Sequence, residues 1–202
     1  ILSDYRIVTI FISRDEIAEM VKKNMLVRPD RGKWDKEVEA DMLASPIALR
    51  KTIKRKRIRH AVSFHSTVAR ADAFRKSQAA FTEVFPSFGR LESFHVSGKT
   101  PTAVRARQIE DFEESKRALI TNARCLTEGV DVPGIDCVLF ADPKRSTVDI
   151  VQAVGRALRR AEGKKLGYVI VPILLDSEVQ DDKELEDSAF ETILTVLRAL
   201  AS

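Results

Sequence analysis

The sequence is poor in the residues that build several common kinds of functional site. It contains two cysteines, Cys125 and Cys137, and three histidines among 202 residues. A structural zinc site needs about four clustered ligands, so we expect no metal site. Both cysteines lie in apolar segments, which is typical of reduced, buried thiols in a cytoplasmic protein. No apolar run approaches the ~20 residues of a membrane-spanning helix, so we expect no membrane partner.

A self-sufficient ATP-hydrolysing site is also incomplete. A phosphate-binding loop has the pattern Gly-x-x-x-x-Gly-Lys-Ser/Thr. The chain has Gly98, Lys99 and Thr100, but Ser93 stands where the first glycine belongs, and Pro101 removes a backbone donor. The chain has no Asp-Glu-x-His or Asp-Glu-Ala-Asp box either. An autonomous nucleotidase that uses residues 98–100, with the strand around Val138 as its second motif, therefore stays an alternative only.

The ends and the bulk composition suggest one domain taken from a longer protein. The first residues lack the basic region and apolar core of a signal peptide, and the chain does not begin with Met. Hydrophobic residues make up 44% and charged residues 32%, which is ordinary for a globular domain. We expect residues 1–202 to form a single lobe, with a C-terminal helix at 183–201.

Charge is concentrated in two blocks, although the formal net charge is only +4. The basic block comprises Arg50, Lys51, Lys54, Arg55, Lys56, Arg57 and Arg59. The acidic block comprises Asp176, Glu178, Asp181, Asp182, Glu184, Glu186 and Asp187. Basic clusters are typical of proteins that bind polyanions, but charge runs also cover ordinary solvated faces. Both interpretations of the basic block stay open at this point.

Apolar, β-branched runs alternate with amphipathic segments along the chain. We expect strands at 6–12, 60–64, 91–96, 118–121, 136–140 and 167–174. We expect helices at 34–57, broken near Pro46, and at 66–85, 101–114, 146–161 and 183–201. Continuous apolar strands separated by helices predict a mostly parallel sheet covered on both faces. The predicted fold is a three-layer α/β/α domain.

The strongest functional pattern lies in the helix expected at 146–161, which Ser146 and Asp149 would cap. At ~100° per residue, one side carries Gln152, Gly155, Arg156 and Arg159. The opposite side carries Ile150, Val151, Val154, Ala157, Leu158 and Ala161, which can pack on the sheet. Two arginine forks one turn apart suit phosphoryl transfer, in which charge builds on phosphate oxygens. An ordinary basic surface is the alternative.

A second pattern follows the strand expected at 118–121. Residues 121–133, TNARCLTEGVDVP, would leave the carboxyl end of the sheet, where open α/β folds bind ligands. There Gly129 would let the backbone approach a ligand closely, and Asp131 could accept a hydrogen bond from a ribose hydroxyl. A Gly-Val-Asp tripeptide alone is more often a simple turn.

In order and spacing, these segments resemble the C-terminal, second RecA-like domain of superfamily 2 helicases. Residues 61–66 (AVSFHS) resemble motif IV, residue 121 with 128–133 resembles motif V, and 152–159 (Q-x-x-G-R-x-x-R) resembles motif VI. The segment 95–98 and the helix at 105–112 resemble the usual link between them. The resemblance covers residues 58–172, and residues 1–57 match only loosely.

The resemblance implies a RecA-like motor lobe that works with a separate ATP-binding lobe. Arg156 and Arg159 would be arginine fingers that reach ATP, and Gly129, Asp131 and Gln152 would line the nucleotide side of the cleft. The DNA or RNA backbone would contact Ser63, Ser66, Ser97, Gly98 and Thr121, a kind of contact that positions without reading sequence. Mg²⁺ would be held mainly by the other, N-terminal lobe.

Two departures narrow the resemblance. Gln152 stands where DEAD-box RNA helicases usually have histidine, and 128–131 reads Glu-Gly-Val-Asp, which also differs from their pattern. Both favour the DEAH-like group, which includes restriction-enzyme translocases and DNA repair helicases. The alternative from another class is a helicase-like module that binds nucleic acid or protein without motor activity. Intact Gln152, Arg156 and Arg159 favour the motor.

Overall fold

The computed structural model describes residues 5–27, 36–122, 134–142, 146–157, 166–175 and 191–201. The strands are β1 (Tyr5–Ser13), β2 (His60–Phe64), β3 (Glu92–Val96), β4 (Ala118–Asn122), β5 (Cys137–Phe140) and β6 (Gly167–Leu175). The helices are α1 (Arg14–Val27), α2 (Lys36–Lys56), α3 (Val68–Val84), a short 3₁₀ turn η1 (Pro86–Phe88), α4 (Thr102–Glu114), α5 (Thr147–Ala157) and α7 (Glu191–Ala201). Every predicted strand is present within a residue or two of its expected bounds.

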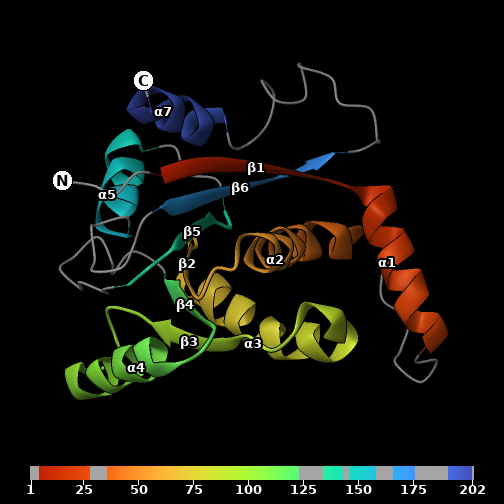
Figure 1. Ribbon diagram of the computed structural model, residues 1–202, viewed down its shortest axis with the longest axis horizontal. Coiled ribbons are helices and arrows are strands. Elements are labelled where there is room, and N and C mark those ends of the chain that lie inside the picture. The colour runs from red at the N-terminus through yellow and green to blue at the C-terminus, as the bar shows by residue number, and fades with distance from the viewer. Residues whose placement is uncertain are drawn as a thin grey trace.

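The strands form one six-stranded sheet in the order β1-β6-β5-β2-β4-β3 (Figure 1). Every pairing in it is parallel. The central strand β2 pairs with β4 on one side and β5 on the other, with Ser63 opposite both Thr121 and Leu139. The predicted α/β fold with a parallel sheet is therefore confirmed. A parallel arrangement brings the carboxyl ends of all the strands to one edge.

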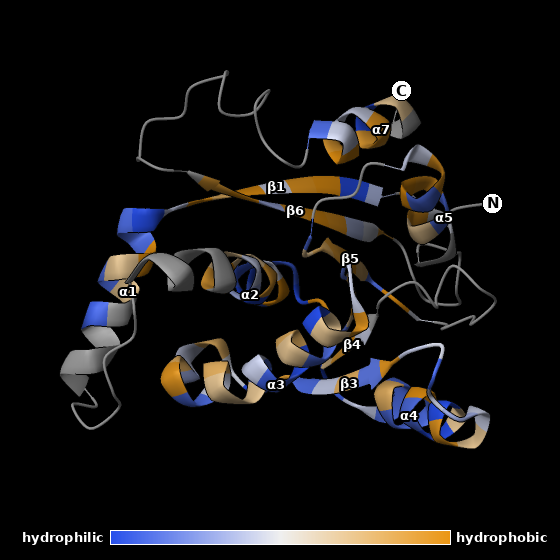
Figure 2. Ribbon diagram, turned by 180° about the vertical axis from the view of Figure 1, so that it is seen from behind, coloured by the Kyte–Doolittle hydropathy of each residue, from blue (hydrophilic) through white to orange (hydrophobic). Residues whose placement is uncertain are grey.

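Helices cover both faces of the sheet, which explains why the central strands are apolar throughout. Helices α1, α2 and α3 pack on one face around Ile47, Leu49 and Phe81. Helices α4, α5 and α7 pack on the other face around Phe112 and Ile150. Figure 2 shows β1 and β6 coloured as hydrophobic along most of their length, between these two layers. The three-layer architecture follows from burial on both faces.

Helix α2 runs without a break through Pro46, so the expected interruption there is wrong. A proline inside a helix loses one backbone hydrogen bond. Here the helix is held by burial, because Leu43, Ala44, Ile47 and Ala48 all lie in the core of that face. Tertiary packing therefore outweighs the local cost of the proline.

Helix α1 was missed by the sequence reading. Its start is a Ser-x-x-Glu capping sequence, in which the backbone N–H of Glu16 donates to the Ser13 hydroxyl at 3.0 Å. That signal is visible in the sequence and could have located the helix. By contrast, Ser146 caps α5 as predicted, because the Asp149 N–H donates to the Ser146 hydroxyl at 3.3 Å.

Candidate nucleic-acid and nucleotide interface

The predicted polar residues after β2, β3 and β4 lie along the carboxyl edge of the sheet. Parallel pairing sets Ser63 and His95 each opposite Thr121, so the ends of these three strands are level. Ser66 follows β2 and Ser97 follows β3, and Asp142 follows β5 at the same edge. The structure thus brings the residues predicted to contact nucleic acid to one rim.

Three of those hydroxyls, however, face the interior. Ser63 and Thr121 have no exposed surface, and Ser97 is 5% exposed. The Ser63 hydroxyl lies 2.9 Å from His65 Nε2, and the Thr121 hydroxyl lies 3.0 Å from His95 Nδ1. In this arrangement the three hydroxyls contact neighbouring side chains, and the contact of these residues with a nucleic-acid backbone stays a prediction. Among the rim residues named from sequence, Ser66 and Gly98 are the exposed ones.

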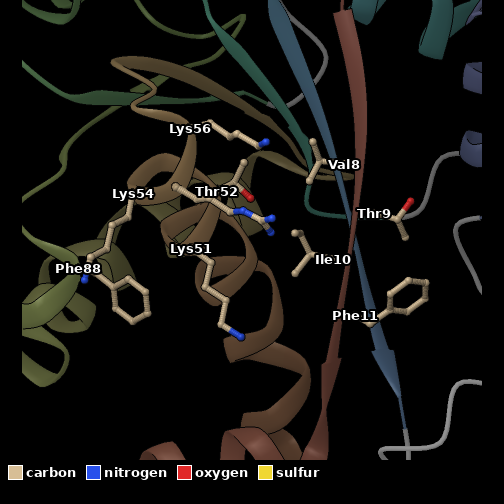
Figure 3. Close-up of a pocket in the computed structure, with 10 residues that line it drawn as sticks. Val8, Thr9, Ile10, Phe11, Lys51, Thr52, Lys54, Lys56 and Phe88 are labelled. Carbon is tan, nitrogen blue, oxygen red and sulfur yellow. The ribbon is translucent and has the colours of Figure 1, made fainter.

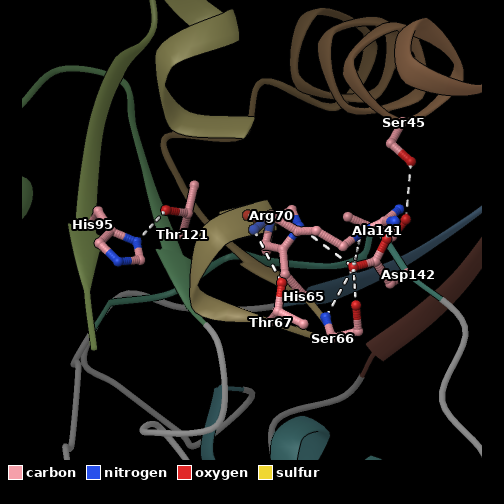
Figure 4. A network of polar contacts seen from close by, with 10 residues as sticks. Ser45, His65, Ser66, Thr67, Arg70, His95, Thr121, Ala141 and Asp142 are labelled. Carbon is pink, nitrogen blue, oxygen red and sulfur yellow. Dashed lines mark hydrogen bonds and ion pairs between the residues drawn. The ribbon is translucent and has the colours of Figure 1, made fainter. Parts of the chain in front are cut away.

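The centre of the rim is the Asp142 carboxylate, which the sequence reading did not single out (Figure 4). Its Oδ2 accepts from the Ser66 N–H at 2.8 Å, from the Ser66 hydroxyl at 2.9 Å and from Arg70 Nε at 2.9 Å. Its Oδ1 accepts from Arg70 Nη2 at 2.6 Å. One buried carboxylate therefore connects the end of β5 to the loop after β2 and to the first turn of α3.

Electrostatics keep this cluster in one charge state near neutral pH. Burial would raise the pKa of Asp142, but the donors of Ser66 and Arg70 outweigh it and lower that pKa. Burial lowers the pKa of His65 to about 4, with Asp142 acting in the opposite direction and Arg70 and His95 adding to the decrease. His65 is therefore neutral at pH 7, with its ring 4.8 Å from that of Phe74. It buttresses the loop without adding charge.

The turn after β3 does not have the geometry of a phosphate-binding loop. The N–H of Ser97 donates to the Thr100 hydroxyl at 3.0 Å, and the N–H of Thr100 donates to the Ser97 carbonyl at 2.9 Å. Arg105 Nη2 in α4 then donates to the carbonyls of Ser97 and Thr100 at 3.3 and 3.1 Å. Because these backbone donors are used inside the turn, the autonomous nucleotidase loses its main support. Gly98 stays exposed at the tip.

Helix α5 begins at Thr147, shortly after Asp142 in the chain, and presents an exposed face. Ile150, Ala153 and Val154 are buried against the sheet, and Gln152 is exposed. A methyl group added at Gly155 would meet nothing within 4 Å, so this position faces open space. Val151 is 37% exposed, so its predicted place on the buried side is wrong; Ala153 occupies that side instead. The helix turns Val151 away from the sheet by ~160° relative to Ala153.

Part of the predicted nucleotide site lies outside the described residues. Arg156 belongs to α5, but its side chain is not among those described. Arg159, Gly129 and Asp131 lie outside the described ranges altogether. Their assignments therefore stay predictions.

The end of the basic block lies at the opposite edge of the sheet from the rim. The N–H of Arg59 donates to the Asp136 carboxylate at 3.0 Å, and its carbonyl accepts from Ala118, so residue 59 sits where β2, β4 and β5 begin. Lys51 pairs with Glu16, and Lys54 donates to the Ser87 carbonyl at 3.2 Å. Several of these cations border a cavity of about 510 Å³ between α2 and the edge strand β1 (Figure 3).

Arg50, the first residue of the basic block, is a core residue with 1% exposure. Its guanidinium donates to Gln78 Oε1 at 3.1 Å, to the Gly89 carbonyl at 2.8 Å and to the Thr82 hydroxyl at 3.0 Å. Burial lowers its pKa to about 10, so it stays charged near neutral pH. Arg50 thus ties α2 to α3 and cannot contact a ligand. The internal contacts of Arg50, Lys51 and Lys54 and the position of Arg59 favour the structural and solvated interpretation over a nucleic-acid contact.

Neither a metal centre nor a membrane span is found in the part of the chain that the structure describes. No group of three or more His, Cys, Asp or Glu side chains within those ranges could hold a metal ion. Within the same ranges, no helix combines the length and the apolar character needed to cross a membrane.

Comparison with known proteins identifies the fold's family. Residues 44–161 match the family described as the helicase conserved C-terminal domain, which is more than half of the chain. The chain belongs to this family. A putative ATP-dependent helicase of Saccharomyces cerevisiae, IRC3, is 29% identical over 118 residues, which cover 52% of this chain and 17% of that protein. The probable helicase A859L of African swine fever virus is 34% identical over 104 residues, covering 50% of this chain and 11% of the relative.

Solved structures agree with this membership. The ATP-dependent Type ISP restriction-modification enzyme LlaBIII, determined bound to DNA, superposes on all of this helicase C-terminal domain with a TM-score of 0.75 at 28% identity. The C-terminal part of the Fun30 ATPase domain superposes on 92% of it with a TM-score of 0.56 at 14% identity, which shows the fold alone. This helicase domain spans 14% of the restriction-modification enzyme and less than a fifth of the helicase relatives named above.

Proposed function

We propose that this helicase C-terminal domain is the second motor lobe of an ATP-dependent nucleic-acid translocase or helicase. In that role it closes an ATP site whose phosphate-binding loop belongs to another lobe, and it forms one wall of the nucleic-acid groove. DNA is the proposed substrate, since the restriction-modification enzyme that superposes on the whole chain is described as bound to DNA. The yeast relative is named an ATP-dependent helicase, which supports the use of ATP.

The observation that carries this proposal is the exposed face of α5. Val148 is 62% exposed and Val151 is 37% exposed, and Gln152 and the open position at Gly155 accompany them. At ~100° per residue, these four positions and Arg156 fall within an arc of ~140°. Exposed apolar residues beside an amide are typical of a surface that docks against another protein body and a ligand.

The chemistry proposed for this face is electrostatic. During phosphoryl transfer, negative charge spreads over the equatorial oxygens of the γ-phosphate, and Mg²⁺ together with arginine side chains stabilises it. Arg156 and Arg159 would supply the guanidinium groups, which stay protonated and can bind two oxygens at once. Gln152 would donate or accept a hydrogen bond beside them, and Gly155 would leave room for the nucleotide. Mg²⁺ would be held by the other lobe.

The nucleic-acid wall would be the rim around Asp142. Ser66 and Gly98 are its exposed members among those named from sequence, and the buried Ser63 and Thr121 would support it from below. Contacts of this kind go to phosphate and sugar and do not distinguish bases. They suit a motor that moves along any sequence.

The test is ATP hydrolysis by the protein that carries both lobes, with and without single-stranded or duplex DNA, compared with this chain alone. We expect the two-lobed protein to show DNA-stimulated ATP hydrolysis. This chain alone should hydrolyse ATP no faster than buffer without protein. ATP hydrolysis by this chain alone would contradict the shared site and revive the loop at 98–100. DNA binding without any ATP hydrolysis by the two-lobed protein would instead identify a non-catalytic binding module.

A further inference from the structure

Arg70 is an exposed cation at the rim, and Asp142 holds one side of its guanidinium. Its Nε donates to Asp142 Oδ2 at 2.9 Å, and its Nη2 lies 2.6 Å from Asp142 Oδ1. This pairing uses two parallel donors, a geometry that restricts both the distance and the plane of the guanidinium. The backbone N–H of Arg70 also donates to the Thr67 hydroxyl at 3.1 Å, which caps α3.

The two ends of this ion pair differ sharply in exposure. The Asp142 side chain is 6% exposed, whereas the Arg70 side chain is 65% exposed. The carboxylate therefore lies inward, and the guanidinium lies at the surface beside Ser66. Within the described part of the chain, Nη1 of Arg70 has no hydrogen-bond partner, so its donors remain for a ligand.

Charge and shape both favour a phosphate as the ligand of Arg70. The guanidinium presents planar, paired donors that match phosphate oxygens. In Figure 4, Arg70, Ser66 and Thr67 lie together around Asp142, at the strand-end rim. A phosphate at the surface would lie nearer to the guanidinium than to the buried carboxylate, so attraction would outweigh repulsion.

We propose that Arg70 binds a backbone phosphate of the nucleic acid and that Asp142 is the residue that positions it. This inference rests on the proposed function, because it assigns a further contact to the same groove. Asp142 also accepts hydrogen bonds from both the N–H and the hydroxyl of Ser66, so one carboxylate positions the exposed serine and the arginine. The contact by Arg70 is thereby preorganised, which reduces the entropy lost on binding.

The primary experiment measures the affinity of the two-lobed protein for a fluorescent single-stranded DNA as a function of salt concentration. Loss of one phosphate contact in Arg70→Ala should reduce the slope of log K against log salt by ~0.7. Between 1 M and 0.1 M salt, the affinity of the variant relative to wild type should therefore fall about fivefold. Binding should weaken equally for DNA of different sequence.

The matched control is Lys76→Ala on the same helix. Lys76 is a 67% exposed cation that pairs with Asp72, much as Arg70 pairs with Asp142. It lies ~9 Å further along the helix axis, away from the rim. Its removal deletes the same formal charge, so an equal loss of slope in both variants would mean a general charge effect and would overturn the assignment to Arg70.

Asp142→Asn separates positioning from simple electrostatics, because the two effects have opposite signs. Removing a negative charge near a polyanion should tighten binding if only net charge matters. If Asp142 orients Arg70, the variant should weaken binding towards the Arg70→Ala value instead. In an Arg70→Ala background, Asp142→Asn should then add little, which a double-mutant cycle measures.

Thermal unfolding of each variant reports whether the fold is intact. Unchanged salt slope in Arg70→Ala, or additive losses in the cycle, would overturn the inference while leaving the motor function standing. Wild-type protein that hydrolyses ATP but binds no DNA would overturn both the groove and this inference. The proposed ATP site alone fails if DNA binds as described but ATP is not hydrolysed.

Discussion

The buried His65 predicts a specific loss of stability when the pH falls below neutrality. His65 is 3% exposed, and burial lowers its pKa to about 4 in the folded protein, against 6.5 for an ordinary histidine. In the unfolded chain the ring takes up a proton as the pH falls through about 6.5. In the folded chain it takes up that proton only near pH 4. Between these values protonation favours the unfolded state, so the stability contributed by neutral His65 is complete above pH 6.5 and decreases below it.

The magnitude follows from the two pKa values. At pH 5 the unfolded histidine gains about 2 kcal/mol from protonation, and the folded one gains almost nothing, so the free energy of unfolding falls by about 2 kcal/mol relative to pH 8. Asp142 stays ionised at pH 5 because its pKa is lowered, so it does not contribute to the loss of stability between pH 8 and pH 5.

Urea unfolding at pH 8, 7, 6 and 5 of the wild-type chain and of His65→Gln measures the effect. Glutamine does not titrate and can still bond to the Ser63 hydroxyl, so the difference between the two pH profiles isolates His65 from His95 and the carboxylates. We expect the variant to be less stable at pH 8 but to lose about 2 kcal/mol less between pH 8 and pH 5. Parallel profiles would refute the description of His65 as a buried, neutral support of the rim.

Three other variants test separate parts of the domain. Gly155→Ala should raise the free energy of unfolding in urea by about 0.5–1 kcal/mol, because alanine favours the helix and its methyl group contacts nothing within 4 Å. The same variant should lower ATP turnover, and normal turnover would mean that the nucleotide does not approach this face. Arg50→Leu should lower the free energy of unfolding by at least about 3 kcal/mol, since several buried acceptors lose their donor. A change near zero would show that water molecules replace the lost donor. Replacing Arg55, Arg57 and Arg59 by glutamine should leave the salt slope of DNA binding unchanged, and a flatter slope would place DNA at both edges of the sheet.

The strands and the parallel sheet were predictable because burial on both faces leaves a simple signature, a short and wholly apolar run. The same signature hides which way each residue points. In β2 all five residues are buried, so nothing in HAVSF shows that Ser63 faces inward. A half-exposed strand would have shown alternation and settled the direction.

The candidate site was only partly predictable because its central residue acts over long sequence distances. Asp142 contacts Ser66 and Arg70, which are 76 and 72 positions away along the chain. No local pattern connects such positions; only the pairing of β2 with β5 brings them together. The direction of Val151 was mispredicted for a different reason: an apolar residue at the boundary of a helix's buried face can point either way, and here Ala153 is buried instead.

The central claim is that α5 lends arginine side chains to an ATP site completed by another lobe. It is tested most directly by single-turnover hydrolysis of ATP by the two-lobed protein bound to DNA, comparing wild type with Arg156→Ala and Arg159→Ala. The account predicts that hydrolysis falls ~10³-fold or more in each variant, while the dissociation constant for ATP changes much less. Hydrolysis at the wild-type rate in both variants would contradict the claim and leave α5 as an ordinary basic surface.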